Sequence, residues 1–158
     1  MSTSPRLEPI TPATIDAALE LRVHPHQAKN VAPVVRSLAE AYAYGETAWP
    51  RLVFDGEELV GFVMAFVDIQ WDPEKDPDDR RSGLWRLNIG AACQGKGYGR
   101  FAVEAVREEL VRRGAGEMYV CWEPGEDGPG EFYRRLGFRE TGETAGEQVV
   151  GMLAIGPA

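Results

Sequence analysis

With 158 residues, of which 44% are hydrophobic and 9% aromatic, the chain is long enough to bury a core of ordinary size. We therefore expect a single domain over residues 1–158. The formal net charge of −8 argues against a protein that binds nucleic acid or anionic membranes non-specifically.

The chain has two cysteines, Cys93 and Cys121. Two thiols make neither a disulfide framework nor a metal site unaided, so we expect free thiols in a reducing compartment and no bound metal. No apolar run approaches the length of a membrane span, and residues 1–5 do not begin a signal peptide. These features predict a cytoplasmic protein without a membrane or nucleic-acid partner.

The first third of the chain predicts one strand and two helices. Residues 6–10 alternate between polar and apolar, as a strand does, and Thr11 can cap a helix that continues through residues 15–22. The second helix is expected over residues 34–44 and ends at Gly45.

A β-hairpin follows, with strands at residues 49–54 and 59–69. The second of these strands is apolar on both faces, so it should be central and covered on two sides. Residues 71–81 contain five carboxylates and two prolines, which favour a solvated loop. The alternative is an acidic lip that attracts a polycation.

Residues 94–99, Gln-Gly-Lys-Gly-Tyr-Gly, lie between a strand predicted at 84–89 and a helix predicted at 100–113. Glycines let the backbone approach a ligand closely, and the free N–H groups at the start of a helix attract anions. This order of elements predicts a diphosphate site. The glycines alone also leave open a plain tight turn.

Three phosphate-loop patterns can be compared with this segment. The dinucleotide pattern G-x-G-x-x-G fails because Arg100 stands at the third glycine, and the pattern G-x-x-x-x-G-K-[ST] puts Gly97 where a magnesium-binding hydroxyl is required. The pattern Q/R-x-x-G-x-G/A fits, with Gln94, Gly97 and Gly99 at its fixed positions. The segment resembles the coenzyme A pyrophosphate loop of the GNAT N-acetyltransferases, which implies acetyl-CoA as the cofactor. A nucleotide-binding module is the rival interpretation.

The rest of the chain extends this resemblance. A strand is expected at 117–122, a loop at 123–130, a short helix around Tyr133 that ends at Gly137, and strands at 139–143 and 148–155. The order β-α-α-β-β-β-α-β-α-β-β favours an α+β fold. It is similar to the GNAT fold, which implies a mixed, mostly antiparallel sheet of six to seven strands flanked by about four helices.

The resemblance also implies which residues bind the coenzyme. In the family, backbone groups at the end of the strand before the loop bind the pantetheine arm, and one N–H group acts as an oxyanion donor. The implied coenzyme-binding residues are Leu87, Asn88, Ile89, Gln94, Gly95, Lys96, Gly97, Tyr98, Gly99, Arg100 and Tyr133.

Tyr133 is the first catalytic candidate. Residues 131–138 resemble the family's helix after the fifth strand, whose tyrosine hydroxyl protonates the leaving thiolate. A phenol is a neutral proton donor at pH 7, with a reference pKa of about 10. An amphipathic core tyrosine would look the same in the sequence.

The general base is less well defined, because no motif supports any candidate. Glu123, at the end of a strand, is the residue that we select, and Asp68, Glu46 and the two histidines are alternatives. The family often has an asparagine that contacts the coenzyme at the position of Glu126, and a carboxylate cannot donate a hydrogen bond as an amide does.

The acceptor is suggested by residues 21–27 and 31–33, which resemble the polyamine or diamine branch of the family. His24, His26 and Gln27 are therefore the implied substrate-binding residues, although the two histidines also fit a polar turn that ends a helix. Asn30 stands where an aromatic residue is expected.

The predicted activity is acetyl transfer from acetyl-CoA to a primary amine of a small polycation, such as spermidine, spermine or a diamine, by direct attack in a ternary complex. Three alternatives stay open: acetylation of an aminoglycoside-type antibiotic, acetylation of an amino acid or a peptide amine, and an acyl-CoA sensor without activity. The sequence also leaves open a homodimer.

Overall fold

The computed structural model describes residues 4–156, which form one seven-stranded sheet in the order β1-β2-β3-β4-β5-β7-β6. Every neighbouring pair is antiparallel except β4 and β5, which are parallel. The mixed α+β fold predicted from the sequence is therefore confirmed. The strands are β1 (Pro5–Glu8), β2 (Ala48–Asp55), β3 (Glu58–Asp72), β4 (Asp76–Ile89), β5 (Glu117–Trp122), β6 (Arg139–Ala145) and β7 (Gln148–Ala154).

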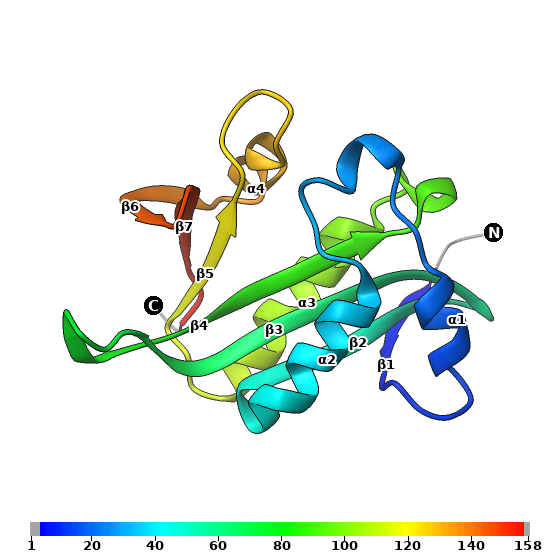
Figure 1. Ribbon diagram of the computed structural model, residues 1–158, viewed down its shortest axis with the longest axis horizontal. Coiled ribbons are helices and arrows are strands. Elements are labelled where there is room, and N and C mark those ends of the chain that lie inside the picture. The colour runs from blue at the N-terminus through cyan, green and yellow to red at the C-terminus, as the bar shows by residue number, and fades with distance from the viewer. Residues whose placement is uncertain (1–3, 157–158) are drawn as a thin grey trace.

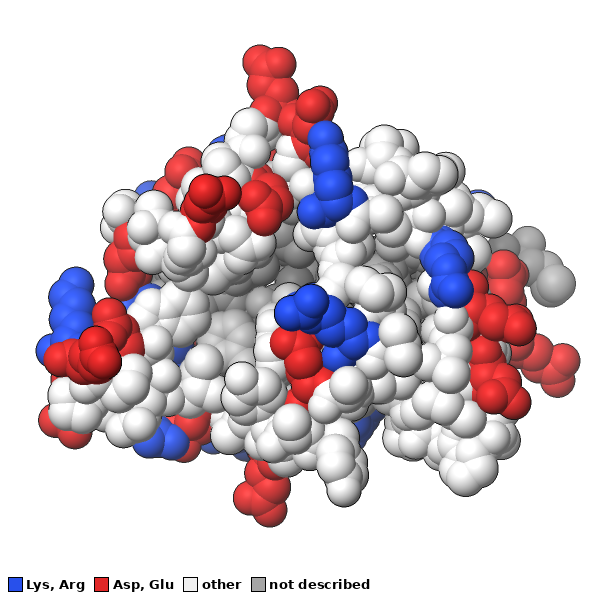
Figure 2. Space-filling view, viewed as in Figure 1, with Lys and Arg blue, Asp and Glu red and all other residues white. Residues whose placement is uncertain are grey.

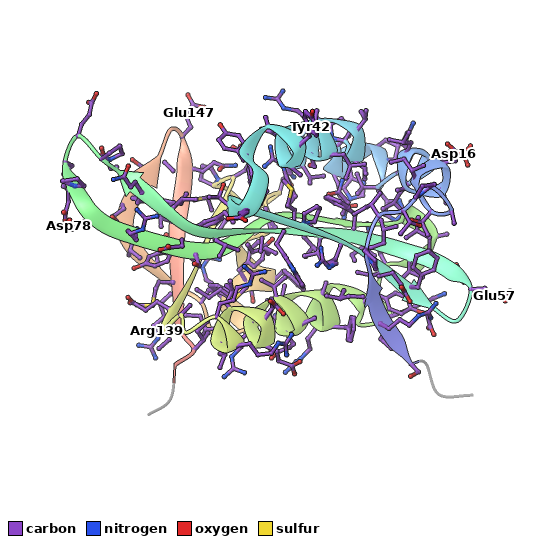
Figure 3. The ribbon with its side chains drawn as sticks, turned by 90° about the horizontal axis from the view of Figure 1, so that it is seen from below. Asp16, Tyr42, Glu57, Asp78, Arg139 and Glu147 are labelled. Carbon is purple, nitrogen blue, oxygen red and sulfur yellow. The ribbon has the colours of Figure 1, made fainter. Side chains whose placement is uncertain are left out.

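Four α-helices lie in this part of the chain: α1 (Ile15–Glu20), α2 (Val34–Tyr44), α3 (Tyr98–Arg112) and α4 (Gly130–Arg135). Helix α2 covers one face of the sheet and α3 covers the other (Figures 1 and 3). Short 3-10 turns occupy Pro25–Gln27, Gly45–Thr47 and Ala91–Cys93. Helix α1 ends at Glu20, two residues before the predicted end of the helix at 15–22, and α3 begins at Tyr98, two residues before its predicted start.

The two faces of the sheet carry separate cores. The face under α3 holds the larger core, which includes Val63, Val103 and Trp122. The face under α1 and α2 holds the smaller one, which includes Ala18 and Phe62. The central part of β3 is buried on both faces, as its apolar pattern predicted.

The prediction of a solvated loop at residues 71–81 is wrong. Strand β3 continues to Asp72 and β4 begins at Asp76, so the segment is the end of a long hairpin. Arg81 explains the difference: its guanidinium binds both oxygens of Glu143 on β6 and packs over the rings of Trp71 and Tyr119. Contacts from distant strands thus override the weak strand preference of Asp and Pro.

No helix among the described residues is long and apolar enough to cross a membrane. The same residues contain no group of three or more His, Cys, Asp or Glu side chains arranged to hold a metal ion.

Candidate active site

Strands β4 and β5 separate and open a V in the middle of the sheet. They pair only at Gly83 with Tyr119 and at Leu84 with Val120. A bulge in β4 starts the separation, because Met64 pairs with Arg86 and Ala65 with Leu84, which leaves Trp85 as an extra residue. Beyond this point the strands diverge (Figure 1).

A cavity of about 1150 Å³ occupies the V and extends to both sides of it. Its walls come from the segment between α1 and α2, the end of β4, the loop before α3, the end of β5 and α4. Figure 2 shows this face of the molecule hollowed between its two halves, with Lys and Arg side chains near the rim.

The glycine-rich loop forms one end of the cavity. Gly95 and Gly97 have φ angles of 79° and 87°, in the left-handed region that glycine adopts at little cost. The backbone N–H groups from Gln94 to Arg100 have no acceptor among the described residues. A row of free amides at the start of a fifteen-residue helix can bind an anion such as a diphosphate.

Gln94, the first fixed residue of the motif, contacts protein atoms. Its Nε2 donates to the backbone oxygen of Ile89 (3.0 Å) and to Oε1 of Gln27 (2.6 Å). The amide of Gln27 donates in return to Oε1 of Gln94 (2.9 Å). The side chain of Gln94 thus holds the loop against the end of β4, and its backbone N–H is the group that remains available.

The side chain of Tyr98 is likewise turned into the protein. It is buried, and its hydroxyl donates to Oδ2 of Asp55 at the end of β2 (2.5 Å). This hydrogen bond to a carboxylate, together with burial, raises the pKa of Tyr98 to about 12. Tyr98 can therefore offer a ligand only its backbone N–H.

Tyr133 on α4 faces the cavity from the β5 side. Its ring stacks on Trp122 with centroids 5.6 Å apart and meets Phe132 and Phe138 edge to face. The residue is only 7% exposed, and its hydroxyl has no hydrogen-bond partner among the residues described. Burial raises the pKa of the phenol, so Tyr133 stays protonated at neutral pH.

The end of the cavity away from the loop is aromatic and was not predicted. Tyr44, Phe66, Trp71 and Trp85 line it together with Arg86. No sequence pattern signals this set, because its members come from α2, β3 and β4 and meet only through the bulge and the long hairpin.

A comparison with families of known proteins matches residues 16–138 to the Acetyltransferase (GNAT) family. The chain belongs to the GNAT acetyltransferase family. It is an acyl-CoA-dependent N-acetyltransferase that uses acetyl-CoA, as the sequence predicted. No curated protein sequence matches the chain.

Solved structures support the fold. An aminoglycoside acetyltransferase, AAC(6')-Ib with coenzyme A, has a TM-score of 0.73 at 20% identity, covering 96% of this chain and 95% of its own. An acetyltransferase from Thermus thermophilus has a TM-score of 0.71 at 22% identity, covering 96% and 97%. The ribosomal-protein-S18-alanine N-acetyltransferase from Escherichia coli has a TM-score of 0.66 at 16% identity, covering 98% and 96%.

The predicted coenzyme-binding residues on β4 of this GNAT chain lie on opposite faces of the sheet. Leu87 and Ile89 line the cavity and pack toward α3. Asn88 is buried on the opposite face, where its Nδ2 donates to the backbone oxygen of Ala32 (3.0 Å). The side chain of Asn88 therefore holds the segment before α2, and only its backbone could serve the coenzyme.

Most of the predicted coenzyme-binding residues of the glycine-rich loop line the cavity, but Lys96 does not. Gly95, Gly97, Gly99 and Arg100 line the cavity. Lys96 is exposed and does not line it. A Cβ atom at Gly99 would lie 3.2 Å from the ring of Phe132, so this glycine also allows α3 to pack against α4.

Glu123 lies at the end of β5 and lines the cavity, and it accepts a hydrogen bond from Nε2 of Gln148 (3.2 Å). Glu126, at the position of the family's asparagine, is exposed and lies outside this cavity. The loop that carries it approaches the N-terminal segment, where Nδ2 of Asn30 donates to the backbone oxygen of Asp127 (3.4 Å).

The predicted substrate-binding residues form the 3-10 turn before α2. The rings of His24 and His26 stack with centroids 5.4 Å apart. His26 and Gln27 line the cavity, whereas His24 does not. Since Gln27 is paired with Gln94, this turn lies beside the glycine-rich loop.

Proposed function

We propose that this protein transfers the acetyl group of acetyl-CoA to a primary amine of a small molecule in a ternary complex. The observation that carries the proposal is that Tyr133 and the loop before α3, whose backbone amides are free from Gln94 to Arg100, line one cavity. Acetyl-CoA supplies an activated acetyl group there. The remaining steps belong to residues of this chain.

The coenzyme is held by backbone groups. The amides from Gln94 to Arg100 bind its diphosphate, and Arg100 adds a positive charge at the same end of the cavity. Beyond Leu84, the edge of β4 that faces β5 has no strand partner. Successive residues of a strand direct their N–H and C=O groups alternately to its two edges. The groups of Leu87, Asn88 and Ile89 that face away from β3 are those that a pantetheine arm can pair with, except for the C=O of Ile89, which already accepts from Gln94.

Glu123 and Tyr133 move the protons. A free alkylamine has a pKa of about 10.4, so its deprotonation at pH 7 costs roughly 4–5 kcal/mol. Glu123 accepts this proton as the amine nitrogen bonds to the acetyl carbon. The carbon–sulfur bond breaks, and Tyr133 gives its proton to the departing thiolate and regains one from solvent.

The charged residues that line the cavity do not favour a polyamine as the acceptor. The acidic segment at Asp72 to Asp79 lies at the end of the β3–β4 hairpin, where Asp78 points away from the body of the molecule (Figure 3). None of these carboxylates lines the cavity. The charged side chains that do line it are Glu123 and Asp127, against Lys29, Arg36, Arg86 and Arg100. The proposed acceptor is therefore a small primary amine without a second ammonium group.

The replacement Tyr133→Phe tests the proposal. It removes one hydroxyl that bonds to no described residue, so folding and coenzyme A binding should be unchanged. The rate of thiol release from acetyl-CoA with a reactive amine should fall roughly 10²- to 10⁴-fold, as it does when a general acid is removed. Tyr42→Phe is the matched control, because Tyr42 is 92% exposed on α2.

Calorimetry with coenzyme A and a thiol-release assay with a panel of amines separate the outcomes. An unchanged rate in Tyr133→Phe removes this residue from the mechanism. Coenzyme A binding without thiol release from any amine in the panel would refute acetyl transfer to a small primary amine.

A further inference from the structure

Arg86 is a largely buried cation at the aromatic end of the cavity. Its side chain is 16% exposed, and one nitrogen, Nη2, donates to Oε1 of Glu40 on α2 (2.9 Å). The same carboxylate oxygen lies 3.8 Å from Nε of Arg36. Two guanidinium groups thus share one carboxylate, which leaves a net positive charge beside the cavity.

The remaining donors of Arg86 are free. Its Nε and Nη1 atoms have no acceptor within residues 4–156, although the side chain lines the cavity. A guanidinium presents parallel N–H groups in a planar fork that matches the two oxygens of a carboxylate. Burial lowers the pKa of Arg86, because the charge has lost water that Glu40 does not fully replace.

Arg86 and the proposed general base, Glu123, lie on the two strands that form the V. Arg86 is the second residue of β4 after the last pair with β5, so it lies on one arm of the V at its apex, while Glu123 lies on the other arm. The same cavity is also lined by the aromatic residues Tyr44, Phe66 and Trp85. A molecule with an amine at one end and an anion at the other would match both arms.

We propose that the acceptor is an amine that carries a carboxylate on an apolar or aromatic body, and that Arg86 binds this carboxylate. The assignment rests on the proposed acetyl transfer and names its substrate class. Arg86 is then a specificity-determining residue: it selects carboxylate-bearing amines and disfavours polycations, which would meet an uncompensated guanidinium.

Matched amine pairs test the substrate class. Phenylalanine is compared with phenylalaninamide, 4-(aminomethyl)benzoate with benzylamine, and spermidine serves as the polycation. In the phenylalanine pair the carboxylate raises the pKa of the neighbouring ammonium, so the amide would react faster if the carboxylate were not recognised. We expect kcat/KM to be about 10- to 100-fold higher for the carboxylate member of at least one pair, as a charged hydrogen-bonded contact gives.

Two variants should shift this ratio in opposite directions. Arg86→Met removes the cation and keeps the length of the side chain, so the preference for the carboxylate member should disappear. Glu40→Gln removes the competing carboxylate charge and keeps an oxygen acceptor, so the preference should increase. Arg107→Gln, which replaces an arginine on the exposed face of α3 outside the cavity, should leave the ratio unchanged.

The outcomes are distinguishable. Equal kcat/KM within both pairs, or ratios that neither Arg86→Met nor Glu40→Gln changes, would refute the role of Arg86 while acetyl transfer stands. Preferred turnover of spermidine would also refute it. If coenzyme A binds but no amine releases thiol, the proposed function fails, and this assignment fails with it. If Arg86→Met does not fold, Glu40→Gln alone still decides, since its effect has the opposite sign.

Discussion

The replacement Gly97→Asp tests the diphosphate site directly. Gly97 has a φ angle of 87°, and a Cβ atom built there meets no atom within 4 Å. The replacement therefore costs about 1–2 kcal/mol of backbone strain without a steric clash, and the protein should still fold. The new carboxylate would lie beside the free amides and repel a diphosphate.

The size of this repulsion can be estimated from Coulomb's law. Two unit charges about 4 Å apart interact by about 4 kcal/mol at an effective dielectric constant of 20, and salt reduces this at an open site. We expect a loss of roughly 2–4 kcal/mol, or roughly 30- to 1000-fold weaker binding of coenzyme A. Isothermal titration calorimetry measures it, and the loss should shrink as salt is added.

Gly146→Asp provides the matched control. Gly146 also has a positive φ angle, 61°, and no atom within 4 Å of an added Cβ, but it lies in the β6–β7 turn, outside the cavity. Both variants should lose similar stability, and only Gly97→Asp should lose coenzyme A. If the folded Gly97→Asp protein binds coenzyme A as the control does, the diphosphate does not lie on this loop.

Two further predictions concern stability. Gly83→Ala should destabilise the protein by roughly 1–3 kcal/mol in urea unfolding, because its Cβ would lie 2.0 Å from the backbone oxygen of Tyr119 where β4 and β5 meet. Gly116→Ala, with no atom within 4 Å, should cost little, and equal effects would contradict this reason. Hydrogen bonds from Arg81 lower the pKa of Glu143, so their stabilisation is present above the unfolded value of about 4.3 and is lost as pH falls through the lowered pKa. Glu143→Gln should therefore reduce the acid-induced drop in melting temperature below pH 5, and an unchanged drop would exclude this pair as its cause.

The parts of the fold that local patterns determine were predicted from the sequence. The strand at 84–89, the glycines at 95 and 97 and the following helix form within about thirty residues, and turn and helix signals specify them. The buried centre of β3 follows equally from its own apolar residues. These elements form the end of the cavity where we propose that the coenzyme binds, so a local motif was enough to indicate it.

The roles of individual motif residues could not be predicted in the same way. Gln94 and Tyr98 belong to the coenzyme motif, yet their side chains bind Gln27 and Asp55, which lie 67 and 43 residues away in the sequence. A motif records that a residue type is required and does not say whether its side chain or its backbone meets the ligand. The loop predicted at 71–81 was wrong for a related reason, because the contact that supports the hairpin joins Arg81 to Glu143, 62 residues away in the sequence.

The acceptor end depends on a single extra residue. Leu84 packs toward α3, and strict alternation would place Trp85 toward α2 and Arg86 toward α3. Trp85 does pack with the core under α2, but because of the bulge Arg86 also reaches α2, at Glu40. Without this bulge the guanidinium would point into an apolar core, where an unpaired charge is costly. The strand separation that opens the cavity and the cation that we assign to acceptor selection therefore have one structural cause.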